Sequence, residues 1–202
     1  MTILWYTLAL LASYLIGSVP SGWIVTRVWL GEDNRQFGSG NIGATNVLRT
    51  IGVAPAILVL LLDAAKGVVG VYLGGLVGED FSRVLCGIAA IAGHNWSAYL
   101  GFRGGKGIAT SAGVLFALWP HIGLILLGVF LLVVGITRYI SLGSVTVAVI
   151  FPILLLLFRM PLRILLAGLV LSFFAVFRHS ANIKRLWKGQ EYKIGEKGRP
   201  RS

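Results

Sequence analysis

The sequence predicts an all-α protein, a polytopic bundle of transmembrane helices. Of its 202 residues, 56% are hydrophobic and only 12% are charged, and the mean hydropathy of +0.85 is far above that of a soluble domain. The apolar residues gather in long runs, and a helix needs about 20 of them to cross a bilayer. We therefore expect about seven membrane helices, some of them short. They should form a single domain over residues 1–202, without room for a separate soluble domain.

The apolar runs give the expected order of the helices. They cover residues 3–25, 54–77, 83–100, 108–119, 121–137, 140–158 and 161–177. The run 108–119 is too short to cross a full bilayer alone. If residues 108–137 formed one span, the basic tail would end on the side opposite the loops that hold Arg49 and Arg103, against the positive-inside tendency. Two passes or one re-entrant pass are therefore expected, and the sequence leaves both open.

The charges predict the orientation. Eighteen basic and seven acidic residues give a net charge of +11, and much of the excess follows Phe177. The basic residues of this tail are Arg178, Lys184, Arg185, Lys188, Lys193, Lys197, Arg199 and Arg201. A cytoplasmic C-terminus on anionic lipid is expected. The first run is expected to be a retained span, because no basic residue precedes Arg27 and the basic start of a cleaved signal peptide is therefore missing. With seven passes and a cytoplasmic tail, the N-terminus is expected outside. A nucleic-acid role would need stacking aromatic groups or a soluble basic face, and neither is visible.

Three polar, glycine-rich and basic segments interrupt the apolar runs. They are residues 38–46 with Arg49, residues 93–95 continuing to 103–107, and residues 178–182. Glycines expose backbone N–H groups, Ser, Thr and Asn add neutral donors, and Arg and Lys add charge. With seven passes all three segments face the cytoplasm, so they indicate phosphate-bearing substrates at one membrane surface.

The first segment matches the dinucleotide pattern G-x-G-x-x-G, but no strand precedes it and no βαβ unit surrounds it, so that interpretation fails. The following residues 44–48 are compatible with a helix, whose N-terminal amides would favour an anion. A structural turn explains the glycines equally well. Arg49 could add a bidentate contact to a phosphate or serve only as a positive-inside charge.

The other two segments also permit two interpretations each. Residues 103–107 place two cations around three glycines, more than a simple basic turn requires, which favours binding. His179 and Asn182 share a helix face if the last span continues past residue 178. The histidine could be catalytic or structural.

Polar and small residues inside the second run predict packing features. Asp63 and Lys66 are three residues apart and are expected to form an ion pair that offsets their burial. A series of glycines at helical spacing is expected to let neighbouring helices approach closely. These are Gly67, Gly70, Gly74 and Gly78.

The absence of several known motifs limits the kinds of reaction that this protein could catalyse. The sequence has no HExxH, Walker loop, GxSxG elbow or metal-spaced cluster, and its single cysteine, Cys86, is expected in the core. No metal and no cofactor are expected. None of His94, His121 and His179 has an aspartate five positions on, so the dyad of acyltransferases that use acyl-CoA or acyl-carrier protein is absent. An alternative to an enzyme that acts on phosphate-bearing substrates is a transporter of an organic phosphate. Such a transporter would place its binding sites near the membrane midplane and carry internal repeats.

Taken together, the segments closely resemble the bacterial acyl-phosphate:glycerol-3-phosphate acyltransferases over nearly the whole chain. The matching stretches are GSGNIGATN at 38–46 with Arg49, LDAAKG at 62–67, GHN at 93–95, FRGGKG at 102–107, RHSANIKRL at 178–186 and GQE at 189–191. The resemblance implies transfer of a fatty acyl group from acyl phosphate to the 1-hydroxyl of sn-glycerol 3-phosphate. The products would be lysophosphatidic acid, for phospholipid biosynthesis, and inorganic phosphate. The implied location is the inner membrane of a bacterial cell, with the active site facing the cytoplasm.

The resemblance and the motif chemistry together assign roles to residues. Catalytic roles fall to Ser39, Arg49, His179 and Asn182, and glycerol 3-phosphate would be held by these four with Lys106. Acyl phosphate would be bound by Gly40, Asn41, Gly43, Ala44, Thr45, Asn46, Gly104, Gly105 and Gly107. Structural roles are expected for Asp63, Lys66 and Glu191. The two substrates and membrane lipid are the expected partners, and a monomer is the simplest assembly. The general base (His179 or a substrate phosphate), the chain-length preference, the oligomeric state and the route of donor delivery stay open.

Overall fold

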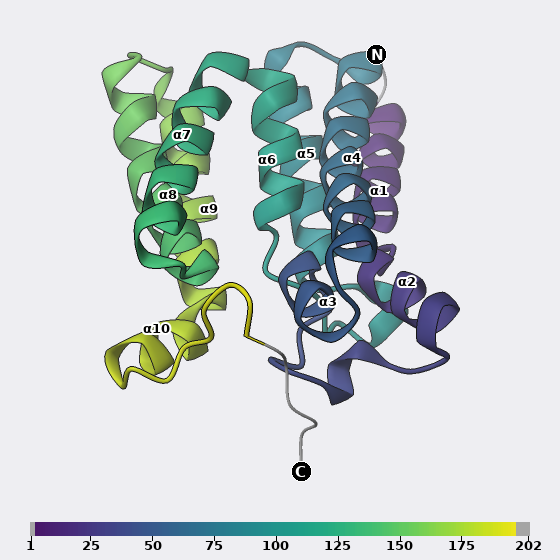
Figure 1. Ribbon diagram of the computed structural model, residues 1–202. Helices are drawn as coiled ribbons and strands as arrows, with labels where there is room; N and C mark the ends of the chain where they lie inside the picture. Colours follow the sequence, from purple (N-terminus) through teal and green to yellow (C-terminus); the bar gives the residue numbers. More distant parts are fainter. Residues whose placement is uncertain (1–2, 197–202) are drawn as a thin grey trace. The chain divides into compact units, whose positions relative to one another are not determined.

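The computed structural model describes residues 3–196 and is helical, which confirms the predicted fold class (Figure 1). Of the basic residues in the predicted tail, Lys197, Arg199 and Arg201 lie outside the described residues. The regular elements are α1 (Ile3–Ser18), α2 (Ser21–Leu30), η1 (Asn34–Gln36), α3 (Ala44–Thr50), α4 (Val53–Val77), α5 (Asp80–Asn95), η2 (Ala98–Leu100), α6 (Ile108–Leu118), α7 (Pro120–Thr137), α8 (Ile140–Leu157), α9 (Leu162–Arg178) and α10 (Ser180–Trp187).

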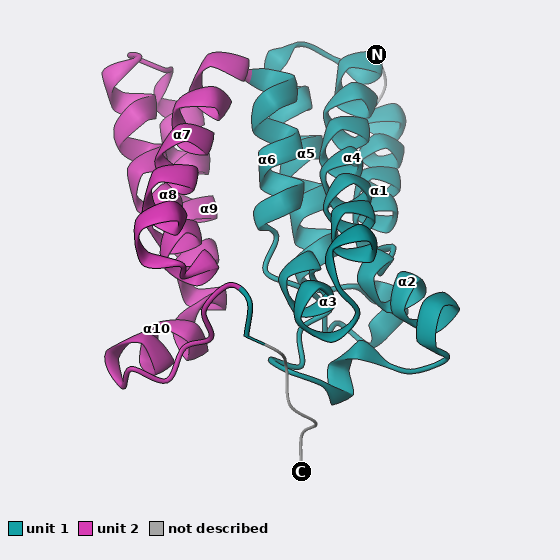
Figure 2. Cartoon of the chain, in the orientation of Figure 1, with its two compact units in different colours: residues 1–118, 195–202 teal, residues 119–194 magenta. Residues whose placement is uncertain are grey.

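The chain divides into two compact units, coloured separately in Figure 2. The first contains α1 to α6 together with residues 195–196, and the second runs from residue 119 to residue 194. In the first unit α4 packs against α1, α5 and α6, and α3 packs on α4. In the second unit α8 packs between α7 and α9, and α10 contacts both α8 and α9.

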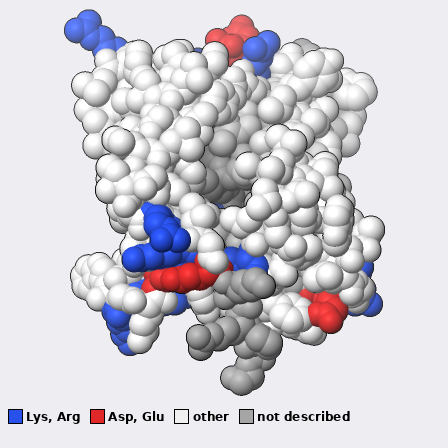
Figure 3. All heavy atoms as spheres, in the orientation of Figure 1, with Lys and Arg blue, Asp and Glu red and all other residues white. Residues whose placement is uncertain are grey.

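Several helices are long and apolar enough to cross a membrane. The segments Ile3–Leu30, Val53–Val77, Pro120–Thr137 and Ile140–Leu157 meet the requirement among the described residues, and α9 with α10 adds a fifth if the bent pair is one span. Figure 3 shows the helices covered by uncharged side chains on the visible face, with charged atoms near helix ends. The 16 residues of α5 and the 11 of α6 rise only about 24 Å and 17 Å. Seven passes therefore stay a prediction.

The structure corrects two boundaries of the apolar runs. The run 3–25 forms two helices, because Pro20 has no N–H and precedes the start of α2. In the run 83–100 the helix α5 ends at Asn95, and the residues that follow are hydrogen-bonded to α1. Ser97 Oγ donates to the Ser18 carbonyl at 2.5 Å, and Tyr14 Oη donates to the Trp96 carbonyl at 2.7 Å.

Residues 108–137 are not one continuous helix, as the distribution of positive charge predicted. The chain breaks at Trp119, whose φ of −141° and ψ of 76° are not helical, and Pro120 starts α7. Whether the short helix α6 crosses the bilayer or re-enters stays a prediction.

The glycines of α4, and Gly78 directly after it, are packing positions, which confirms their predicted role. A Cβ at Gly67 would overlap the α6 backbone, and a Cβ at Gly70 or Gly74 would crowd the α5 backbone. At Gly78 it would meet side chains of α1 and α5. Close backbone approach at these positions lets four apolar helices form one bundle with good van der Waals contact.

Candidate functional site

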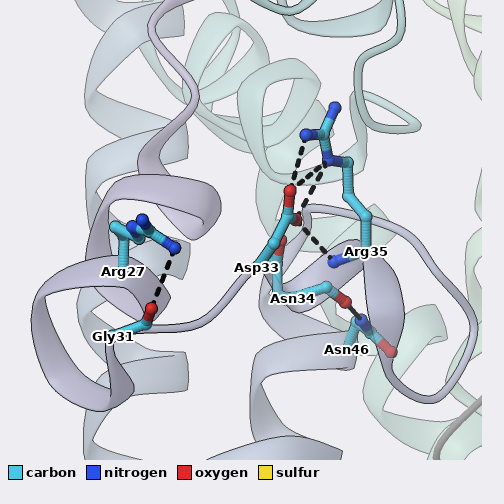
Figure 4. Close-up of polar contacts among 6 residues, drawn as sticks. All are labelled: Arg27, Gly31, Asp33, Asn34, Arg35 and Asn46. Carbon is cyan, nitrogen blue, oxygen red and sulfur yellow. Dashed lines mark hydrogen bonds and ion pairs between the residues drawn. The ribbon is translucent and has the colours of Figure 1, made fainter.

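The first segment is organised by the Asn46 side chain, which is only 1% exposed in the first turn of α3. Its Oδ1 accepts from the Ser39 amide at 2.8 Å and from Ser39 Oγ at 3.2 Å. Its Nδ2 donates to the carbonyls of Asn34 at 2.8 Å and Phe37 at 3.1 Å, and Figure 4 shows the contact with Asn34. One buried amide thus fixes Ser39 against the start of α3.

Two glycines of this segment lie in a turn, and Gly22 of α2 allows a close approach to the segment. Gly38 and Gly40 have φ values of 55° and 69°, in the left-handed region that favours glycine. Gly22 of α2 lies so close to the Ile42 carbonyl that a Cβ there would overlap it, and Asn34 Nδ2 donates to the same carbonyl at 3.3 Å. Gly38 and Gly40 therefore lie in a turn, and a role of this turn in phosphate binding stays a prediction.

Several backbone amides of the segment are already engaged, which narrows the set that was expected to bind a phosphate. Gly40, Gly43 and Asn46 each donate their amide N–H to an acceptor in the same loop at 2.9 Å. The amides of Ala44 and Thr45 begin α3 and precede the first intrahelical donor. These two amides are the better placed of the segment for an anion.

Arg49 lies in the last turn of α3, three residues after Asn46, and is half-buried. The same helix is closed by Thr50, whose Oγ1 donates to the Asn46 carbonyl at 2.9 Å. Both residues are therefore positioned by α3: Arg49 belongs to this helix, and Ser39 is hydrogen-bonded to Asn46 in its first turn.

An ion pair that the sequence analysis did not predict stiffens the entry to this segment (Figure 4). Arg35 Nη2 lies 2.6 Å from Asp33 Oδ2, and the Arg35 amide donates to Asp33 Oδ1 at 2.9 Å. The hydrogen bond from the Arg35 side chain lowers the pKa of Asp33 from its ordinary value of 3.8. Asp33 also caps η1, a placement that an Asp two residues before an Arg could have suggested.

The two halves of the second segment pack on each other. The Gly105 amide donates to the His94 carbonyl at 2.8 Å, and the Gly104 amide donates to the Asn95 carbonyl at 3.2 Å. A Cβ at Gly104 would overlap the His94 carbonyl, and one at Gly105 would overlap the His94 ring. Gly107 has a φ of 81°, and its Cβ would lie 2.7 Å from Asn95 Oδ1.

These contacts give the glycines a structural requirement that sequence reasoning did not identify. The amides of Gly104 and Gly105 point into the protein, so the expectation that they donate to a phosphate is not supported by this geometry. Lys106 is half-buried between two buried glycines, Gly105 and Gly107. The loop therefore presents Lys106 from a fixed backbone.

A buried polar group lies behind this loop. Lys66 Nζ donates to Asp63 Oδ1 at 2.6 Å, so the predicted ion pair is formed. His94 Nδ1 lies 3.6 Å from the same oxygen. The side chains of Lys66, Asp63 and His94 are 6%, 2% and 4% exposed. The sequence analysis did not connect His94 with the pair, because the three residues come from α4 and α5 and only packing brings them together.

The third segment contains a bend. α9 ends at Arg178 and α10 starts at Ser180, and the two helices meet at 55°. The condition under which His179 and Asn182 would share one helix face, a continuing span, is therefore not met. Both side chains are nevertheless buried, at 3% exposure.

The histidine has a defined tautomer. His179 Nδ1 lies 2.8 Å from the Ala175 carbonyl oxygen one turn earlier. Because a carbonyl only accepts, Nδ1 carries the proton, and in the neutral ring the lone pair is on Nε2. His179 can therefore act as an acceptor through Nε2.

Glu191 supports the same helix from the chain after α10. Its Oε1 accepts from Asn182 Nδ2 at 2.9 Å, and its Oε2 accepts from Arg185 Nε at 2.7 Å. The carboxylate side chain is 1% exposed. These contacts hold Asn182 and Arg185 and agree with a structural role for Glu191.

The family model described as Glycerol-3-phosphate acyltransferase matches residues 7–189. The chain belongs to the glycerol-3-phosphate acyltransferase family. The resemblance proposed from the motifs is thereby confirmed. In residues 3–196 of this acyltransferase no group of three or more His, Cys, Asp or Glu residues could hold a metal ion.

Named relatives cover the acyltransferase almost completely. It is 47% identical over 191 residues to the Glycerol-3-phosphate acyltransferase of Synechococcus sp. (strain JA-3-3Ab), covering 94% of each chain. It is 45% identical over 192 residues to Glycerol-3-phosphate acyltransferase 2 of Moorella thermoacetica (strain ATCC 39073 / JCM 9320), covering 95% of this chain and 99% of that one.

Two crystal structures of PlsY (YgiH), an integral membrane glycerol 3-phosphate acyltransferase, share the fold. The glycerol 3-phosphate form has a TM-score of 0.89 and 34% identity, covering 94% of this chain and 96% of that chain. The lysophosphatidic acid form has a TM-score of 0.84 and 33% identity, covering 94% and 95%. The acyltransferase described here is therefore an integral membrane protein of the same helical fold.

Proposed function

We propose that this acyltransferase moves a fatty acyl group from acyl phosphate to the 1-hydroxyl of sn-glycerol 3-phosphate and produces lysophosphatidic acid and inorganic phosphate. The observation that carries the proposal is the family match over residues 7–189. The acyl-phosphate donor is supported by the motif set and by the lack of an aspartate five residues after any histidine.

Glycerol 3-phosphate is assigned to five polar side chains: Ser39, Arg49, Lys106, His179 and Asn182. The phosphate dianion suits Arg49 and Lys106, because charge-assisted hydrogen bonds to phosphate are stronger than neutral ones. Ser39 and Lys106 are supported by geometry, since Asn46 fixes the first and buried glycines flank the second. Such prior ordering lowers the entropy that binding would otherwise cost.

The phosphate of the donor is assigned to the amides at the start of α3, Ala44 and Thr45, with Asn41 and Gly107 nearby in their segments. Helix N-terminal amides favour anions because their donors have no intrahelical partner and the helix dipole is positive there. The acyl chain would lie among the apolar helices, where its methylene groups leave water.

The chemistry needs positioning more than an activated enzyme group. Acyl phosphate is a mixed anhydride, so the oxygen of the 1-hydroxyl can attack the carbonyl carbon and expel phosphate as the C–O bond to it breaks. The hydroxyl proton goes either to Nε2 of His179 or to a phosphate oxygen of a substrate. Orientation of the two substrates and stabilisation of the developing charge by fixed donors supply the acceleration.

The reaction is assigned to the cytoplasmic face of a bacterial inner membrane, with a single acyltransferase domain over residues 1–202 and a monomer as the working unit. The basic residues at the end of the chain support this side under the positive-inside rule.

The test uses purified protein in detergent with glycerol 3-phosphate and either palmitoyl phosphate or palmitoyl-CoA, following lysophosphatidic acid and released phosphate. Product from palmitoyl phosphate alone is expected. Product from palmitoyl-CoA alone would overturn the assignment of the donor. Product from neither, while glycerol 3-phosphate still protects the protein against heat, would favour a transporter of an organic phosphate.

A further inference from the structure

His94, which lies beside the buried Asp63–Lys66 ion pair, directly contacts the loop that carries Lys106. His94 contacts the loop twice: its carbonyl accepts from the Gly105 amide at 2.8 Å, and its ring fills the space into which a Cβ at Gly105 would project. We propose that His94, which lies beside the Asp63–Lys66 ion pair, is a positioning residue that sets the conformation of residues 104–107 for phosphate binding. This inference rests on the proposed function of that loop.

The ring rather than the backbone of His94 is the specific element. The three atoms nearest to a Cβ at Gly105 are Nε2, Cδ2 and Cε1 of the imidazole, so the Nε2 edge of the ring lies against that residue. A smaller side chain at position 94 would leave an empty volume under Gly105, and a Cβ at Gly105 cannot coexist with the ring. The two positions are therefore matched in shape.

The Asp63 carboxylate lies beside the ring without a hydrogen bond to His94 Nδ1, so it influences the direction of the ring only electrostatically. Asp63 Oδ1 faces His94 Nδ1 at 3.6 Å and accepts from Lys66 Nζ at 2.6 Å. None of the three side chains is more than 6% exposed. An apolar set of similar volume is often as stable as a buried ion pair or more so. Because this pair lies next to His94, which contacts the loop of Lys106, its contribution to the orientation of the ring explains its presence better than a contribution to stability does.

Asn95, the residue after His94, also contacts the loop with both its carbonyl and its side chain. Asn95 is 3% exposed, its carbonyl accepts from the Gly104 amide at 3.2 Å, and its side chain lies against Gly107. The end of α5 therefore contacts the loop on both sides of Lys106. Because binding groups must be held within about 0.5 Å of their productive geometry, a shift of this support would be felt in substrate binding.

The test is a double-mutant cycle between His94→Ala and Gly105→Ala, read as KM and kcat with palmitoyl phosphate and glycerol 3-phosphate. Each single variant is expected to raise the KM for glycerol 3-phosphate on the order of 10- to 100-fold. The double variant should lose less than the product of the two factors, because the new methyl group enters the space that the ring leaves. His121→Ala is the matched control: this exposed histidine packs on Phe158 in the other unit and should leave both constants unchanged.

A second variant covers the case in which His94→Ala fails to fold. Asp63→Asn combined with Lys66→Met removes both buried charges together and leaves the ring in place. It is expected to keep the thermal unfolding midpoint and to raise the KM for glycerol 3-phosphate at least threefold, because the ring loses the electrostatic influence of the Asp63 carboxylate.

The outcomes separate the two proposals. If the wild type forms no product from acyl phosphate, the proposed function is wrong. If the wild type is active, and the folded His94→Ala variant or the charge-free pair has unchanged KM values, the positioning role is wrong while the function stands. Strictly multiplicative effects in the cycle would also overturn it.

Discussion

Removal of the Glu191 carboxylate should destabilise the second unit and inactivate the acyltransferase through Asn182. In the wild type this carboxylate, 1% exposed, accepts from Asn182 at 2.9 Å and from Arg185 at 2.7 Å. Glu191→Ala leaves a buried amide donor without its acceptor, which costs about 1–3 kcal/mol. It also removes a charge-assisted hydrogen bond of about 1.5–3 kcal/mol. Arg185 is 29% exposed and regains part of this from water, so we expect a total of about 3 kcal/mol.

The assay is thermal unfolding in detergent together with the acyl-transfer rate. A loss of about 3 kcal/mol corresponds to a midpoint about 6–12 °C lower for a chain of this size. Glu191→Gln keeps an oxygen for Asn182 but loses the charge that pairs with Arg185, so about half of the shift is expected. The control Glu32→Ala replaces an exposed glutamate and should change the stability by less than about 0.5 kcal/mol.

Two results would refute this reasoning. A Glu191→Ala midpoint within about 2 °C of the wild type would show that the two hydrogen bonds contribute little. An inactive Glu191→Gln variant with a wild-type midpoint would place the carboxylate in the chemistry instead of in support of Asn182.

Four further outcomes are expected. Asn46→Asp keeps the acceptor for Ser39 but turns a carboxylate oxygen toward two carbonyls, so it should lower the unfolding midpoint and the activity, both measured on one preparation; an unchanged midpoint would contradict the role of the amide. Lys106→Ala should mainly raise the KM for glycerol 3-phosphate, and an unaffected saturation curve would remove that assignment. His179→Gln tests the general base: a sharply reduced kcat with an altered pH profile is expected if histidine takes the proton, whereas near-normal turnover with an unchanged profile assigns this step to the substrate phosphate. For Asp33, whose folded-state pKa lies below the ordinary 3.8, the ion pair stabilises the protein above that pH and is lost as the pH falls through the lowered value. The stabilities of the wild type and Asp33→Asn should therefore differ slightly near pH 7, by less than about 1 kcal/mol, and converge only below the lowered pKa of Asp33, which unfolding curves on both sides of that pKa will show.

The sequence predicted the features that depend on neighbouring residues. Apolar run length predicted the helices, and the spacing of Asp63 and Lys66 predicted their ion pair, because residues three apart on a helix are always close. The glycines of α4 were recognised for the same reason, since helical periodicity places them on related faces.

Side-chain packing determined the burial and hydrogen-bond partners of residues that look alike in the sequence. Asn46 and Asn41 belong to the same polar motif, but only the tertiary structure shows that Asn46 is buried and makes hydrogen bonds that hold Ser39 in place. Gly104 and Gly105 suggested phosphate donors, whereas the structure shows their amides bonded to the end of α5.

The sequence alone determined the class of protein, the helices and the three polar segments, because hydropathy and local spacing are properties of the linear chain. The tertiary structure decided which amides are engaged, that the last span bends at His179, and that His94 joins Asp63 and Lys66 behind the loop of Lys106. These features depend on contacts between residues far apart in sequence. Such contacts form only when helices pack, and packing depends on the shape of whole side chains rather than on their polarity.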